Sequence, residues 1–148
     1  MCLTYSKEGT RKFREKYKKG KKTFAIFYKI VYCNSSGIYS GVFHHTWKAG
    51  WNYADKTPYK NKSLGDGRAI NNGIHVYTTK TEAMETNGNS ISYCGDHVLP
   101  VKCYMKDLIG KDGGYKEAVF TKVWVDKAEL NKIMKREKRE QHEQCMDE

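Results

Sequence analysis

The sequence predicts a single α+β domain over residues 1–148, with N-terminal, middle and C-terminal helices around a mixed, mainly antiparallel sheet. A run rich in aromatic and β-branched residues, 23–33, is typical of a buried strand. Residues that can cap helices stand at Ser6, Thr79 and Asp126. The chain is 39% hydrophobic, and a domain of this size buries about 68–70% of its unfolded surface. One core and one domain are therefore expected.

The first predicted element is a basic helix within residues 1–22. Ser6 can cap this helix and Gly20 can end it, while Phe13 and Tyr17 lie one turn apart as its apolar contact. Nine basic side chains against two glutamates place seven of the ten net positive charges here. The basic residues are Lys7, Arg11, Lys12, Arg14, Lys16, Lys18, Lys19, Lys21 and Lys22. Such a cluster can bind a phosphate backbone or can simply be a solvated helix face.

Strands and a long loop are predicted next. Residues 23–33 form the expected central strand, and turn residues at 34–37 predict a hairpin to a strand over 38–43. The segment 44–55 holds two histidines and two tryptophans, so it can line a ligand cleft or form one wall of the core. Residues 57–72 are polar and rich in turn formers, which predicts a surface loop. The basic residues of this loop, Lys60, Lys62 and Arg68, make a second candidate area for an anion.

The stretch 73–86 predicts a strand that passes into a capped helix. Apolar residues alternate with His75 and Tyr77, as in a half-buried strand. Thr79 stands three residues before Glu82, which is the spacing of a capping box. The middle helix is therefore expected to begin directly after Thr79.

The C-terminal third predicts two strands and a helix. Residues 97–105 form one strand, and Pro100 within it indicates an edge or a bulge. Residues 117–125 form the other strand. Asp126, with a glutamate three residues later, repeats the capping spacing at the start of the helix. This helix then loses its apolar stripe, so its charged end, 136–148, is expected to fray unless a partner holds it.

Five residues are candidates for lining a small-molecule pocket. They are Tyr28, Trp47, Trp51, His75 and Tyr77. A histidine beside a carboxylate can act as an acid or base near neutral pH, and Lys29 and Glu117 are candidate neighbours of His75 on adjoining strands. The aromatic rings can stack on a nucleotide-like molecule.

No metal site, cofactor or catalytic residue is predicted. Cys94 and His97 have a metal-like spacing, with Cys103 further on, but a structural zinc site normally shows two tight ligand pairs. Removal of Met1 would make Cys2 N-terminal, as in N-terminal nucleophile enzymes. The glycine that follows that cysteine in class II glutamine amidotransferases is missing. The five scattered cysteines are expected to be reduced thiols.

Charge and hydropathy narrow the kind of partner and the compartment. The formal net charge is +10 and the pI is near 9.3, which favours an anionic partner such as nucleic acid. No apolar run approaches the roughly 20 residues that cross a bilayer, and no signal peptide is apparent. We expect no contact with a membrane. The expected location is the cytoplasm.

Six segments carry an extended resemblance. They are 1–5, 28–31, 47–52, 73–78 with Glu82 and Ala83, 100–108 and 118–124, and they include the motifs GIHVYT and PVKCYMKDL. In these segments the chain is similar to small accessory proteins encoded by tailed bacteriophages, including phages of gut bacteria. The resemblance implies an accessory gene product in the host cytoplasm, and such proteins often inhibit host defence. It brings no activity and no catalytic residues.

These observations predict a noncatalytic phage accessory protein that binds nucleic acid, or a host nucleoprotein complex, through the basic helix and loop. One alternative is a pocket protein that sequesters or modifies a nucleotide-like small molecule. A virion or assembly component is the other. The oligomeric state is open.

Overall fold

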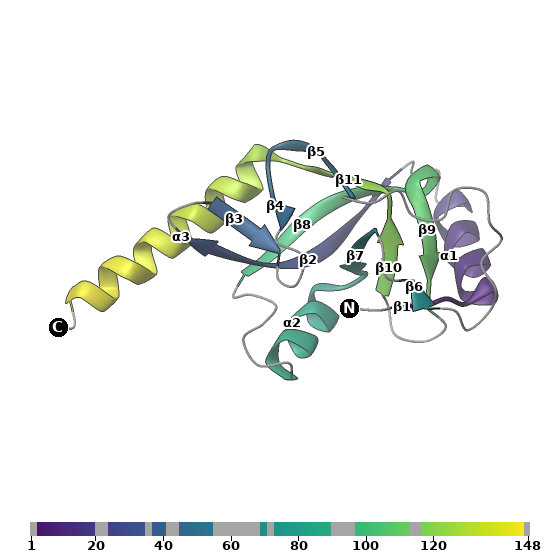
Figure 1. Ribbon diagram of the computed structural model, residues 1–148, viewed down its shortest axis with the longest axis horizontal. Helices are drawn as coiled ribbons and strands as arrows, with labels where there is room; N and C mark the ends of the chain where they lie inside the picture. The colour runs from purple at the N-terminus through teal and green to yellow at the C-terminus, as the bar shows by residue number, and fades with distance from the viewer. Residues whose placement is uncertain are drawn as a thin grey trace.

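A computed structural model of the chain describes residues 3–19, 24–34, 37–40, 45–54, 69–70, 73–89, 97–112 and 117–146. The three helices are α1 (Lys7–Lys19), α2 (Lys80–Asn89) and α3 (Lys127–Met146), and a short 3₁₀ helix, η1, spans Met105–Asp107. The strands are β1 (Leu3–Thr4), β2 (Phe24–Asn34), β3 (Gly37–Ser40), β4 (His45–Thr46), β5 (Gly50–Tyr53), β6 (Ala69–Ile70), β7 (Ile74–Tyr77), β8 (His97–Tyr104), β9 (Leu108–Lys111), β10 (Glu117–Phe120) and β11 (Lys122–Val125). The predicted α+β class is confirmed (Figure 1).

Nine of these strands form one sheet. Its main path runs β5-β11-β8-β2-β7-β10-β9, with β3 on β2 and β4 on β3, while β1 and β6 form a separate pair. Every pairing among the strands that the structure describes is antiparallel. The predicted central strand and its hairpin partner are confirmed, since β2 lies in the middle of the path and pairs with β3.

The sheet curls because its two ends are joined along the chain. β8 continues through η1 into β9, and β10 continues through Thr121 into β11, although these strands lie far apart on the sheet path. The prediction of one strand over 117–125 is therefore wrong. Thr121 interrupts it by donating its backbone N–H to the carbonyl of Asp107 at 2.9 Å, next to a register shift between Val119 and Phe120. The break lets one run of residues pair with two different parts of the sheet.

The inner face of the curled sheet forms the main core. Its fully buried members include Phe27, Leu99, Phe120 and Val123. Helix α1 closes one end of this core, and α3 packs along β8 and β2 (Figure 1). Truncating a buried phenylalanine typically costs about 3–5 kcal/mol of stability, so these side chains dominate the fold.

Helix α1 forms for the predicted local reasons. The Ser6 hydroxyl oxygen accepts the backbone N–H of Gly9 at 3.0 Å, which is the expected N-cap. The Phe13 and Tyr17 rings meet edge to face at 4.9 Å between centroids. Both rings also pack against Phe27, at 5.5 and 5.7 Å. The cap and this aromatic cluster fix α1 on the sheet.

Helix α2 covers part of the outer face of the sheet. The Thr79 hydroxyl accepts the backbone N–H of Glu82 at 3.1 Å, so the predicted cap is confirmed. Ala83 is fully buried and packs with Ile30 and Tyr77. Helix α2 lies over β2, β7 and β8, so it does not cover the outer face of β5 and β11.

One expectation for the C-terminal third needs correction. The Asp126 carboxylate is not the predicted side-chain cap, because its oxygens contact Trp124 Nε1 at 3.1 Å and Lys102 Nζ at 3.5 Å. Helix α3 itself extends to Met146, and its Lys, Arg, Glu and Gln residues are good helix formers.

Strand β8 is internal to the sheet despite Pro100, which had indicated an edge. Among the described strands, β11 pairs with β8 at Lys102, whereas β2 pairs along the whole length of β8. At Pro100 the one described strand neighbour is therefore β2, and the missing N–H is tolerated.

Candidate nucleic-acid interface

A patch of aromatic and lysine side chains lies on the outer face of four neighbouring strands, β5, β11, β8 and β2. Strand pairing aligns Trp51 with Trp124, Trp124 with Lys102, and Lys102 with Ile26. Paired residues of antiparallel strands place their side chains on the same face. These four side chains therefore form one row across the four strands.

A second row lies one side-chain repeat along the same strands. Tyr53 pairs with Lys122, and Phe24 pairs with Tyr104. Each of these four residues lies two positions along its strand from a member of the first row, so its side chain is on the same face of the sheet. We call the eight residues the aromatic face: Phe24, Ile26, Trp51, Tyr53, Lys102, Tyr104, Lys122 and Trp124.

Ring contacts hold the aromatic face together. Trp51 lies 5.4 Å from Trp124 in an edge-to-face contact and 5.5 Å from Tyr104, measured between centroids. Phe24 and Tyr104 lie 5.6 Å apart. Aromatic pairs of this kind are worth about 0.5–1.5 kcal/mol each beyond the area that they bury. The rings are thus held in place before any ligand arrives.

Lysines lie directly over these rings. Lys122 Nζ is 4.4 Å from the Trp51 centroid, and Lys102 Nζ is 5.5 Å from that of Phe24. The Lys102 ammonium also lies 3.5 Å from Asp126, which orients it beside Trp124. Positive charge is therefore placed next to the ring faces.

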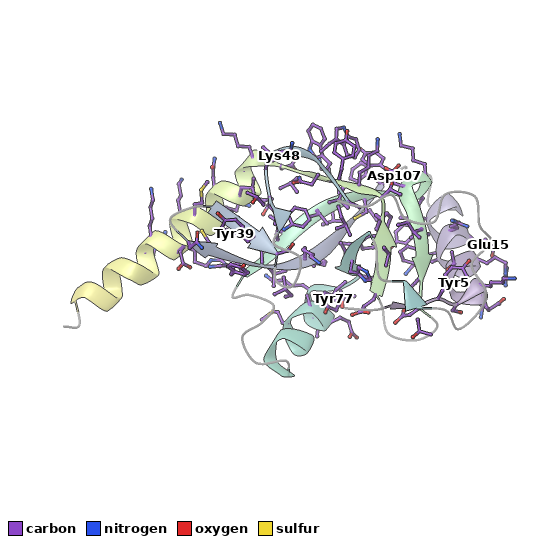
Figure 2. All side chains as sticks on the ribbon, viewed as in Figure 1. Tyr5, Glu15, Tyr39, Lys48, Tyr77 and Asp107 are labelled. Carbon is purple, nitrogen blue, oxygen red and sulfur yellow. The ribbon has the colours of Figure 1, made fainter. Side chains whose placement is uncertain are left out.

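The aromatic face is open to solvent. Tyr53 is 56% exposed and Ile26 is 41% exposed, while Trp51, Tyr104 and Trp124 are half-buried. Figure 2 shows ring-bearing side chains gathered on the outside of β5 and β11, between the labelled Lys48 and Asp107. Flat rings with adjacent cations are suited to stacking on bases and to pairing with phosphates.

Part of the charge on the predicted basic helix is paired within the helix. Arg11 pairs with Glu8 at 2.7 Å and with Glu15 at 2.9 Å. These contacts raise the pKa of Arg11 and lower that of Glu8. Lys12 also lies 3.6 Å from Glu8, and Arg14 donates to the carbonyl of Leu108 at 3.3 Å.

Lys7 and Lys16 are exposed on the same helix. The side chains of Lys18 and Lys19, and the residues Lys21, Lys22, Lys60, Lys62 and Arg68, lie outside the described part of the chain.

The structure divides the five predicted pocket residues into separate groups. Trp47 is 5% exposed and belongs to the main core. Trp51 stands on the edge strand β5, four strands away from β7 on the sheet path. Tyr28 and Tyr77 are paired residues that contact each other beneath α2, and His75 lies on the same strand as Tyr77. The rings of Trp47 and Trp51 thus do not join His75.

A cluster of polar side chains from β2, β7 and β10 lies near His75 instead. His75 is 5% exposed, and among the residues that the structure describes neither ring nitrogen has a hydrogen-bond partner. Lys29 Nζ donates to the His75 carbonyl oxygen at 2.8 Å. The Tyr77 hydroxyl donates to Glu117, whose pKa is raised by burial and by nearby Asp112. Burial, with Lys29 nearby, lowers the pKa of His75 to about 4.

This cluster predicts a pH-dependent stability. Since the unfolded histidine titrates near 6.5 and the folded one near 4, stability is complete above pH 6.5 and is lost as the pH falls toward 4. The loss is about 3 kcal/mol. Urea unfolding of wild type and His75→Gln at pH 7 and at pH 4 measures it. The free-energy difference between the two proteins should change by that amount, and a constant difference would contradict the burial of a neutral histidine.

The candidate metal and thiol residues are only partly described. Cys2 and Cys94 lie outside the described residues, while His97 Nε2 contacts Glu137 Oε2 at 2.8 Å and Cys103 is fully buried. Burial raises the pKa of the Cys103 thiol. Within the described ranges, no three histidine, cysteine or acidic side chains come together as a metal site.

No protein-family model, curated protein or solved structure matches the chain. Among the helices that the structure describes, none combines the length and apolar character needed to cross a membrane.

Proposed function

We propose that the protein binds single-stranded nucleic acid, without catalysis, on the aromatic face. The observation that carries this proposal is the pair of side-chain rows across β5, β11, β8 and β2, in which each row combines aromatic rings with a lysine on a solvent-exposed face. Stacking of bases on such rings tolerates any sequence, because every base has a π face. The lysines supply the phosphate contacts.

A single strand fits this face better than a duplex. In a duplex the bases stack on each other, and their faces are closed to protein rings. In a single strand the bases can be splayed onto Trp51, Tyr53 and Tyr104, while the backbone remains near Lys102 and Lys122. The overall charge of +10 favours the encounter with a polyanion.

The setting that we propose comes from the resemblance to phage accessory proteins. In that setting the protein acts on host or phage nucleic acid, free or within a host nucleoprotein complex, and so inhibits a host defence. Binding alone can have this effect, since a protein that covers a single strand hides it from other proteins.

Tryptophan fluorescence tests the proposal, because the three tryptophans differ in location. Trp51 and Trp124 stand on the aromatic face, whereas Trp47 is buried in the core. Oligothymidine is expected to quench the emission of Trp51 and Trp124 and to leave the emission of Trp47 unchanged. The variant Trp51→Phe/Trp124→Phe, which keeps Trp47, should show no quenching while it still shifts the anisotropy of a labelled strand.

A duplex of the same length serves as the comparison. It should bind more weakly and cause little quenching. Equal binding of duplex and single strand would show that phosphate contacts alone are responsible, and an absence of single-strand binding at low salt would refute the proposal.

A further inference from the structure

Helix α3 leaves the sheet directly beside the aromatic face. It begins at Lys127, immediately after Asp126, whose carboxylate contacts Trp124 and Lys102 of that face. Figure 1 shows α3 running from the end of β11, past β3, to the C-terminal end of the molecule. At about 1.5 Å per residue, its 20 residues extend about 30 Å.

The two sides of α3 differ in chemistry. Leu130 and Ile133 are buried against the core, and Glu137 turns inward to His97. The opposite side carries Lys132, Lys135 and Arg139, all exposed and spaced by three and four residues. We call these three residues the basic stripe. Arg136 and Lys138, both exposed, flank it.

Two of the four glutamates of α3, Glu140 and Glu143, have side chains outside the described part of the chain. The two described glutamates contact residues other than Lys135 and Arg139. Glu129 lies 3.3 Å from Lys132 at the sheet end of the stripe. Glu137 is held by His97 at 2.8 Å on the buried side, away from the stripe. This arrangement contrasts with α1, where two glutamates hold Arg11.

We infer that the basic stripe extends the nucleic-acid site by holding the phosphates of the strand that leaves the aromatic face along α3. The inference rests on the proposed function, since the strand reaches the stripe from that face. Charge complementarity identifies the occupant as a polyanionic backbone, because the stripe offers cations and no rings. The contact between His97 and Glu137 fixes the helix, so the stripe is presented in a constant direction.

Strand length distinguishes the stripe from the aromatic face. Small single-strand-binding modules cover roughly 4–16 nucleotides, so an oligothymidine of about 6 nucleotides lies near the lower end of this range and one of about 20 exceeds it. Wild type should bind the longer strand on the order of tenfold more tightly. The variant Lys132→Gln/Lys135→Gln/Arg139→Gln should lose this gain and bind the short strand as wild type does. Loss of three phosphate contacts should reduce the salt slope for the long strand by about 2.

A variant on α1 is the matched control. Lys7→Gln/Lys12→Gln/Lys16→Gln removes the same charge from exposed positions, and it should keep the length effect. Glutamine preserves helix propensity in both variants. Two results would overturn the inference: an equal loss of the length effect in the two variants, or an unchanged length effect in the stripe variant. In either case, binding of the short strand would show that the proposed function still stands. If wild type binds neither strand, the proposed function fails as well.

Discussion

Replacing Trp51 with alanine is expected to weaken single-strand binding by about 5- to 150-fold, since stacking of one base on an aromatic ring is worth about 1–3 kcal/mol. Trp51 stands at the centre of the ring contacts: it touches both Trp124 and Tyr104, and Lys122 lies over it. Its removal takes away one stacking surface and also the ring that positions Trp124 and Tyr104. The dissociation constant of a labelled oligothymidine, measured by anisotropy, gives the effect.

Two further variants make this result interpretable. Tyr53→Ala removes another ring of the aromatic face at a position that is 56% exposed, so binding should weaken with little loss of stability. Met84→Ala removes an equally exposed apolar side chain on α2, away from the face, and should leave binding unchanged. If Tyr53→Ala and Trp51→Ala both bind as wild type does, the bases do not stack on this face.

The features that could be predicted from the sequence are those determined by residues close to each other along the chain. The caps of Ser6 on α1 and Thr79 on α2 are hydrogen bonds across three residues, so the spacing alone reveals them. The central strand β2 was likewise visible from its aromatic and β-branched run. In each case the decisive contact lies within one short segment.

The aromatic face could not be predicted as a unit, because four strands that are distant in sequence build it. Each strand contributes two residues with a period of two, such as Trp51 with Tyr53 or Lys122 with Trp124. That alternation is a readable signal, but only the strand order shows that the pairs adjoin. Without the order, Trp47 and Trp51 looked equivalent, whereas one is in the core and the other is on the surface.

The pairing of charges on the helices could not be read from composition, for a related reason. Helix α1 has the higher density of basic residues, yet its glutamates stand three and four positions from Arg11 and pair with it. On α3 the partner of Glu137 is His97, which is 40 residues away in sequence. The free charge on a helix face thus depends on pairings that composition does not contain.

Replacing Gly73 with alanine is expected to cause a large loss of stability. Gly73 has φ +105°, and a Cβ there would clash with Val119 Cγ1 and lie 2.8 Å from Ile109 Cδ1. The backbone conformation costs an L residue about 1–2 kcal/mol, and overpacking a close-packed site typically adds about 1–3 kcal/mol. Val119 is fully buried and cannot move aside cheaply. Urea unfolding followed by circular dichroism should therefore show a total loss of about 2–5 kcal/mol.

Gly37→Ala separates the two causes, because Gly37 also has a positive φ, +136°, but a Cβ there would meet the described residues only at ordinary van der Waals distance. The nearest atom to its Cβ would be Tyr39 Oη at 3.9 Å. This control should lose only the backbone contribution, about 1–2 kcal/mol. The difference between the two variants then measures how tightly Gly73 holds the start of β7 against β10 and β9. Equal losses would mean that Val119 and Ile109 yield to a methyl group, and that this corner of the sheet is not close-packed.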